Sequence, residues 1–122
     1  MKTKQFSLRS RIRSFRFALQ GIVDFFMLEH NALIHLLATV LVLAGVWYYR
    51  LTNNEVAIVL IVTGFVWGVE LVNTAIERLA DFIHPEQHDS IKLIKDLSAA
   101  AVLIAAFTAV AAGAFIFIPK IF

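Results

Sequence analysis

Residues 55–83 read EVAIVLIVTGFVWGVELVNTAIERLADFI, and this stretch decides the fold. Residues 56–69 carry no charge, whereas the second half carries Glu70, Asn73, Glu77 and Asp81. On a helix the last three lie at roughly −60°, −20° and +20° from Glu70, so the four form one narrow stripe. A carboxylate in hydrocarbon persists only with a partner or a water-filled cavity. The stripe therefore indicates a metal or proton site at a membrane surface, with a solvated helix face just outside the bilayer as the plainer alternative.

The composition predicts a membrane protein with one small domain, residues 1–122. Hydrophobic residues make up 60% of the 122 residues, and the mean hydropathy is +0.79. Soluble domains are typically about 45–50% apolar, and a core this small cannot hide the excess. The absence of cysteine excludes disulfides and thiolate chemistry.

The amino-terminal segment, residues 5–28, is predicted to form an amphipathic helix on the membrane surface. Its polar residues recur at spacings of four, three, four and four, with Leu, Ile and Phe on the other side. A basic stripe opposite apolar residues suits a helix in the membrane interface, its arginines reaching lipid phosphates, so no nucleic-acid partner is expected. An ordinary amphipathic helix packed on the rest of the protein is the alternative. The polar stripe consists of Arg9, Arg13, Arg16, Gln20 and Asp24.

Three apolar helices are predicted to span the membrane, over residues 31–49, 55–83 and 91–118. Asn54 is a plausible N-cap for the second, Asp89 or Ser90 for the third, and Pro119 is expected to end the third. In the third helix a small residue recurs every fourth position, a spacing that lets helices approach closely in lipid. Three spans and one surface helix cannot enclose a large cavity, so we expect a symmetric homo-oligomer with sites between subunits.

Positive charge sets the expected orientation. The first 16 residues hold six Lys or Arg, and the region around the second loop adds three, against two on the other side. The positive-inside rule therefore places the amino terminus and the acidic stripe in the cytoplasm.

Polar residues from all three spans are expected at this cytoplasmic depth. Carboxylates suit Mg²⁺, a lysine meets phosphate charge, and a further carboxylate can take the proton of an attacking alcohol, as phosphoryl transfer requires. Neither GxxxxGK[ST] nor GxGxxG occurs, which excludes P-loop and protein-kinase architectures. We interpret His30 and His35 as interfacial polar residues. The gathered residues are Glu29, Glu70, Asn73, Glu77, Asp81, Glu86, His88, Asp89, Lys95 and Asp96.

The motif in residues 70–81, ELVNTAIERLAD, closely resembles the signature of the small prokaryotic integral-membrane diacylglycerol kinases, a family that includes undecaprenol kinases. Other segments agree with that family in order and spacing: FRFALQG at 15–21, EHNALIH at 29–35, EQH at 86–88 and KDLSAA at 95–100. The resemblance covers nearly the whole chain, from about residue 14 to residue 120.

The resemblance implies a homotrimer in the bacterial inner membrane that uses ATP and Mg²⁺ to phosphorylate a membrane lipid alcohol. It makes Glu70 the general base, and Glu29 and Glu77 the Mg²⁺ ligands. The nucleotide-binding residues that it implies are Arg13, Phe17, Asn73, Glu77, Glu86, His88, Lys95 and Asp96. Phe17 stands where the family pattern has a tyrosine, so a hydroxyl contact is missing there.

The sequence favours one lipid substrate and leaves one alternative function open. His35 and the ending Ile118-Pro-Lys resemble the undecaprenol-kinase branch, which favours undecaprenol over diacylglycerol. A small oligomeric proton-coupled transporter using Glu70 is the alternative function. A transporter accounts for Glu70 but not for the carboxylates, amide and lysine gathered at the same surface.

Overall fold

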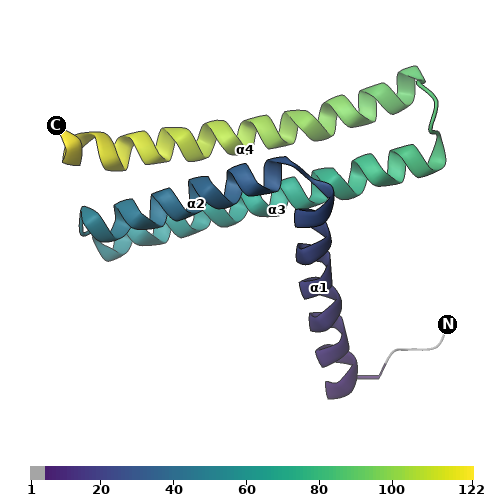
Figure 1. Cartoon of the computed structure of the whole chain (residues 1–122), viewed down its shortest axis with the longest axis horizontal. Coiled ribbons are helices and arrows are strands. Elements are labelled where there is room, and N and C mark those ends of the chain that lie inside the picture. The colour runs from purple at the N-terminus through teal and green to yellow at the C-terminus, as the bar shows by residue number, and fades with distance from the viewer. Residues whose placement is uncertain (1–4) are drawn as a thin grey trace.

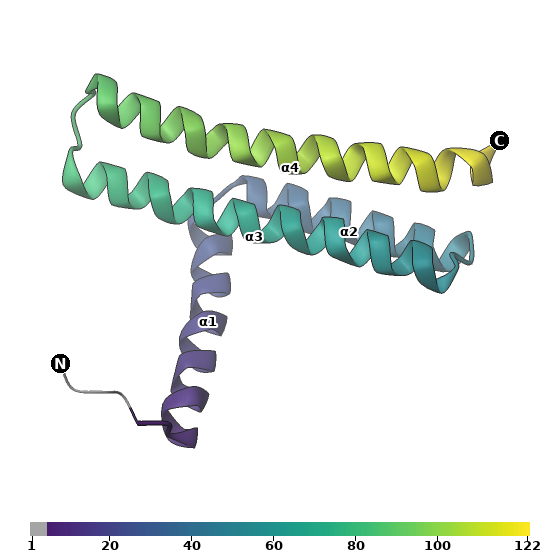
Figure 2. The same cartoon turned by 180° about the vertical axis from the view of Figure 1, so that it is seen from behind.

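A computed structural model describes residues 5–122, which form four α-helices: α1 (Leu8–Leu28), α2 (Asn31–Tyr48), α3 (Asn53–Ile83) and α4 (Asp89–Ile121). Helices α2, α3 and α4 run alongside one another, and α1 projects sideways from them (Figures 1 and 2). Three of the helices are long and apolar enough to cross a membrane. The predicted all-α architecture, with one amphipathic helix followed by three helices able to span a membrane, is confirmed. Lys2 and Lys4, which contribute to the predicted orientation, lie outside the described residues.

Helices α3 and α4 form a hairpin that is much longer than α2. The 18 residues of α2 correspond to about 27 Å, close to the hydrocarbon thickness of about 30 Å. The 31 residues of α3 correspond to about 46 Å. Figure 1 shows the α3–α4 loop extending well past the start of α2. The second half of α3, with its acidic stripe, therefore projects beyond the level at which α2 enters the membrane.

Small and branched residues hold the hairpin together. Ala105 of α4 is 1% exposed, and Val59 and Ala80 of α3 are also buried. Ala105 belongs to the stripe of small residues that recurs every four positions along α4, Ala101, Ala105, Ala109 and Gly113. Near the other end of α2, Tyr49 packs edge-on against Phe117 of α4, with ring centroids 6.0 Å apart. Ala105 packs closely as the spacing predicts, whereas Ala101 is exposed and a side chain at Gly113 would meet no atom within 4 Å.

Most of the apolar surface stays uncovered within one chain. The chain exposes 9996 Å², whereas a compact soluble protein of its 13.7 kDa mass exposes about 6,600 Å² by size scaling. Large apolar side chains such as Phe65, Leu103 and Phe107 are more than half exposed. Lipid or further protein must cover this surface.

Helix α1 begins at Leu8, capped by Ser7, rather than at residue 5, and three other helix ends also differ from the predicted ones. Thr52, rather than Asn54, caps α3: its hydroxyl accepts from the Glu55 amide at 3.3 Å, and its own amide donates to Glu55 Oε1 at 2.9 Å. This reciprocal capping box satisfies two amides that Asn54 does not reach. His88 caps α4, its Nδ1 accepting from the Ser90 amide at 3.1 Å.

The last difference is that α4 continues through Pro119 to Ile121. Proline removes a single backbone donor, and the next turn still closes because the Phe122 amide donates to the Ile118 carbonyl at 3.1 Å. Lys120 then lies 3.2 Å from Glu55 Oε1, and this ion pair joins the ends of α3 and α4.

Helix α1 meets the other helices only at its carboxyl end. Phe25 is 3% exposed, and Phe25 and Phe26 pack against Trp67 of α3 with centroids 6.1 and 5.6 Å away. The rest of its apolar face is open, as expected for a helix lying in the membrane interface. The exposed residues of that face include Leu8, Ile12, Phe15, Leu19 and Ile22.

Candidate active site

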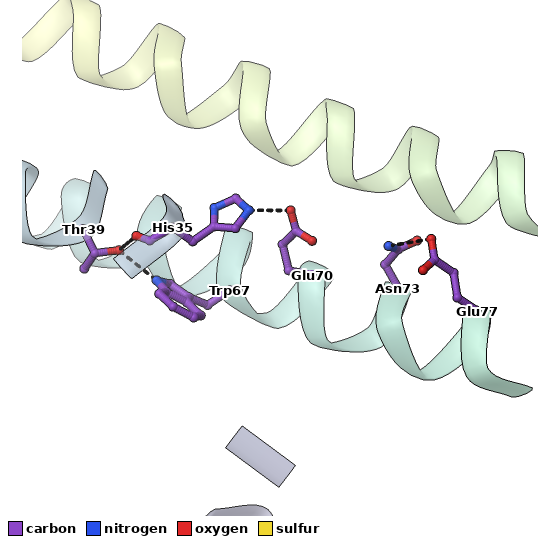
Figure 3. Close-up of polar contacts among 6 residues, drawn as sticks. All are labelled: His35, Thr39, Trp67, Glu70, Asn73 and Glu77. Atoms are coloured by element: carbon purple, nitrogen blue, oxygen red, sulfur yellow. Dashed lines mark hydrogen bonds and ion pairs between the residues drawn. The ribbon is translucent and has the colours of Figure 1, made fainter. Parts of the chain in front are cut away.

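Glu70 is buried in the middle of α3, at the level where α2 begins. It is 8% exposed and follows the uncharged run 56–69. Its Oε1 atom lies 2.7 Å from Nε2 of His35, on the second turn of α2 (Figure 3). The buried carboxylate thus has the polar partner that an apolar environment demands.

Sequence reasoning missed this partner. We interpreted His35 as an interfacial polar residue, but the structure turns its ring toward Glu70. The available signal was that His35 and Thr39 are the only polar interruptions of the apolar residues 32–46. Helical periodicity gives the face of each residue on its own helix, and it does not give the rotation of α2 against α3.

Two further hydrogen bonds hold His35 in place. The Thr39 hydroxyl donates to the His35 carbonyl at 2.7 Å, and the Trp67 indole N–H donates to the Thr39 hydroxyl at 2.9 Å. The His35 and Trp67 rings lie 6.0 Å apart, tilted by 59°. Because Trp67 also contacts Phe25 and Phe26, these contacts connect α1, α2 and α3 at the level of Glu70.

One turn further along α3, a second polar group links α3 to α4. The Ser98 hydroxyl donates to Asn73 Oδ1 at 2.7 Å, and Asn73 Nδ2 donates to Glu77 Oε1 at 3.3 Å (Figure 3). Ser98 is itself buried. These bonds fix the orientation of the Asn73 amide and hold one oxygen of Glu77. The sequence stripe predicted the Asn73–Glu77 neighbours but not Ser98, which lies on another helix.

Beyond these residues the projecting hairpin carries charges that face solvent. Lys95 forms an ion pair with Asp81 across the two helices, and Lys92 pairs with Asp96 along α4. Glu86 and His88 lie in and beside the loop at the tip and are exposed. With Lys95 and Asp96 they line a shallow hollow of about 290 Å³.

The other predicted site residues make no side-chain hydrogen bond or ion pair with this group among residues 5–122. Glu29 is half-buried at the junction of α1 and α2, where its amide donates to the Phe25 carbonyl at 3.0 Å. Arg13 and Phe17 are exposed on α1. No three His, Asp or Glu side chains gather closely enough to hold a metal within the described part of the chain.

Two apolar spaces adjoin the polar residues. A cavity of about 270 Å³ lies between α2, α3 and α4, and His35, Thr39 and Trp67 stand among its apolar lining. A groove of about 770 Å³ follows α3 and α4, from Asn73 and Ser98 along a face with two small residues, Gly64 and Gly68. A buried carboxylate, an oriented amide and a half-buried lysine, Lys95, thus lie along one hairpin beside apolar space. Such a set can accept a proton, coordinate a hard cation and neutralise phosphate.

The chain resembles known membrane lipid kinases over most of its length. Residues 16–117 match the family model described as prokaryotic diacylglycerol kinase. A protein of Bacillus subtilis named undecaprenol kinase is 34% identical over 109 residues, which are 89% of this chain and 89% of that protein. A protein of Synechocystis sp. named diacylglycerol kinase is 33% identical over 109 residues, 88% of this chain.

This chain spans 62% of the length of the Synechocystis relative. The family match over residues 16–117 includes the whole of α2 and α3, and therefore Glu70 and its neighbours His35, Thr39 and Trp67. The chain belongs to the prokaryotic diacylglycerol kinase family.

Proposed function

We propose that this chain transfers the γ-phosphoryl group of ATP to the hydroxyl of a membrane lipid alcohol at the cytoplasmic surface of the bacterial inner membrane. The observation that carries the proposal is Glu70, a buried carboxylate at the end of an uncharged membrane segment with a hydrogen-bonded partner. Membership of a lipid-kinase family supports it. Residues 1–122 would act as one lipid-kinase domain.

In the proposed reaction Glu70 is the general base. The lipid hydroxyl oxygen attacks the γ-phosphorus while its proton passes to the Glu70 carboxylate. The bond from the γ-phosphorus to the bridging oxygen breaks, and its electron pair leaves with ADP. A base at membrane depth suits an alcohol whose tail lies in hydrocarbon, because the hydroxyl then reaches the carboxylate without leaving the bilayer.

The residues present fit a Mg²⁺ site completed by the nucleotide. Mg²⁺ in phosphoryl-transfer sites usually takes one or two carboxylates, with water and phosphate oxygens completing the shell. Glu29 and Glu77 would supply the carboxylates, and Glu77 is already oriented by Asn73. When bound, the ion neutralises charge on the phosphates.

The nucleotide would lie along the projecting hairpin. Asn73 and Lys95 are proposed to contact the phosphates, with phosphate competing against Asp81 for the lysine. The exposed residues near the tip are suited to the nucleoside, and α1 would close over it from the side. The other residues proposed to bind the nucleotide are Glu77, Glu86, His88 and Asp96 on the hairpin, and Arg13 and Phe17 on α1.

A polyprenol such as undecaprenol is favoured over diacylglycerol as substrate. The side-chain donors of His35, Trp67 and Thr39 are already used: His35 Nε2 bonds Glu70, the Trp67 N–H bonds Thr39, and the Thr39 hydroxyl bonds a carbonyl. Diacylglycerol has ester carbonyls beside its hydroxyl. In this site they would lose their hydrogen bonds from water, and these three side chains would not replace them. A polyprenol carries only its hydroxyl. The high coverage of the relative named undecaprenol kinase points the same way.

Purified protein in mixed micelles, given radiolabelled ATP and either undecaprenol or diacylglycerol, tests the proposal. We expect label in undecaprenol, and a fall of about 10²–10⁴-fold in turnover for Glu70→Gln, with ATP binding retained. Labelling of diacylglycerol alone would contradict the substrate preference. Labelling of neither lipid, together with proton flux in vesicles that depends on Glu70, would instead favour the transporter.

A further inference from the structure

We propose that His35 is a positioning residue for the reaction, which ties one oxygen of Glu70 so that the other alone receives the proton of the lipid alcohol. The inference rests on the proposed function. It gives a role to a histidine from α2 that the assignment of base, metal and nucleotide residues leaves unused.

The hydrogen bond between His35 and Glu70 gives the two oxygens of the Glu70 carboxylate different roles. A carboxylate only accepts hydrogen bonds, so Nε2 of His35 carries the proton in the 2.7 Å contact with Glu70 Oε1. Oε2 makes no hydrogen bond to residues 5–122, and no fully buried side-chain nitrogen or oxygen there lacks a partner. Oε2 is therefore accessible, and Figure 3 shows it directed away from His35.

Helices α2 and α3 are joined by two side-chain contacts at the level of the His35 imidazole. His35 and Thr39 are four residues apart on α2, and Trp67 and Glu70 are three apart on α3, so each pair shares a helix face. Two side-chain contacts join the faces, His35 to Glu70 at 2.7 Å and Trp67 to Thr39 at 2.9 Å. Paired in this way, α2 and α3 resist rotation against each other at the level of Glu70.

His35 acts through Glu70 and need not change its own protonation. During transfer the alcohol proton moves to Oε2 while the alcohol oxygen bonds to the γ-phosphorus of ATP and ADP departs. Glu70 then releases the proton to water. Without His35 the carboxylate is free to turn, and its buried oxygen loses its donor. The predicted defect is therefore in turnover and not in substrate affinity.

Substitutions at position 35 separate a hydrogen-bonding role from a packing role. Glutamine places an N–H near the position of Nε2, whereas the shorter asparagine does not reach it and leucine has no donor. His30 is the matched control, because it is exposed beside α2 and makes no side-chain cap. Steady-state rates with ATP and undecaprenol, ATP binding and thermal stability would be measured for each variant.

We expect His35→Leu and His35→Asn to lower kcat by about 10–100-fold with KM for ATP and lipid within about twofold, as for a misplaced catalytic group. His35→Gln should recover most of the rate, and His30→Leu should match wild type. If leucine prevents folding, the glutamine and asparagine pair still decides the question.

Three results would overturn the proposal: a rate for His35→Asn within about twofold of wild type, a glutamine variant as slow as the asparagine variant, or a change confined to KM. An inactive wild-type protein would overturn the proposed function and this inference together. An active wild type that is insensitive to position 35 would overturn only the inference.

Discussion

Two of the buried polar residues, Glu70 and Ser98, each pair with a residue of another helix. Glu70 is paired with His35, and Asn73 with Ser98. A buried donor or acceptor left without a partner costs about 1–3 kcal/mol. Each pair therefore constrains the side chains of two helices at once, which gives the site a defined geometry in a protein with few buried residues.

Ser98→Ala tests the second pair. The change leaves the Asn73 carbonyl without its donor and frees the amide to turn away from Glu77. We expect a loss of about 1 kcal/mol in stability, measured by thermal or denaturant unfolding in detergent, and a higher KM for Mg²⁺-ATP. Thr108→Ala is the control, because its exposed hydroxyl bonds only the Ile104 carbonyl of its own helix at 2.8 Å. Equal effects of the two changes would count against a site role for Ser98.

At the scale of helices, the uneven lengths of α2 and α3 determine where the chemistry lies. Because α2 begins near the level of His35 and Glu70, the remaining turns of α3 and the first turns of α4 project beyond it, and the proposed function places them outside the hydrocarbon. Lipid and nucleotide can then approach the same hairpin at different depths. Glu29 lies at the junction of α1 and α2, and the proposed function places it at the same aqueous boundary.

Removing either proposed metal ligand should therefore affect the nucleotide side of the site. Glu29→Ala and Glu77→Ala are each expected to raise the Mg²⁺ concentration needed for half-maximal activity by tenfold or more, since carboxylates are the protein ligands in such sites. Mg²⁺ titrations at saturating ATP measure this. Asp24→Ala, which removes an exposed carboxylate from α1, is the control. An unchanged Mg²⁺ requirement in both variants would remove the two residues from the metal shell.

The sequence predicted the helices well and their ends less well. A long apolar run bounded by polar residues identifies a span whatever its neighbours do, so the existence and order of α1 to α4 followed directly. Caps depend on local geometry: Thr52 and Asn54 both offer a side-chain oxygen, and only Thr52 stands three residues before Glu55, as a capping box requires. Pro119 cost α4 a single hydrogen bond and did not stop it.

The site was predictable to the extent that it lies on one helix. The stripe from Glu70 to Asp81 follows from the helical repeat alone. The contacts of His35 with Glu70 and of Ser98 with Asn73 were missed. They depend on how α2 and α4 are rotated and shifted against α3, and helix packing determines that arrangement. Lys95 was correctly placed near the acidic stripe, but its partner Asp81 emerged only from the structure.

At the scale of the whole molecule, a single chain leaves its apolar faces open. The groove along α3 and α4 contains Gly64 and Gly68, a spacing of four that favours close approach of another helix in lipid. The predicted homotrimer would cover such a face.

Gly64→Leu tests this prediction. A side chain added at Gly64 meets no atom of its own chain within 4 Å, so the monomer fold should tolerate it. In an oligomer that uses the groove, leucine should shift crosslinking or light-scattering mass toward the monomer and lower activity. Gly21→Leu, at a surface-helix glycine that is also free of close neighbours, should leave the mass unchanged. An unchanged mass for Gly64→Leu would place the subunit contact on another face.

The α3–α4 hairpin is unequal at its two ends, and this makes the proposed reaction one-sided. Within residues 5–122, the end of the hairpin away from the α3–α4 loop is closed by the Thr52 cap and by the Glu55–Lys120 ion pair, and it has no buried carboxylate like Glu70. Only lipid alcohols of the leaflet nearest Glu70 can then be phosphorylated, and the charged product stays in that leaflet because its head group cannot readily cross hydrocarbon. Alcohols of the other leaflet become substrates only after crossing, so their supply is governed by transbilayer movement and not by the kinase.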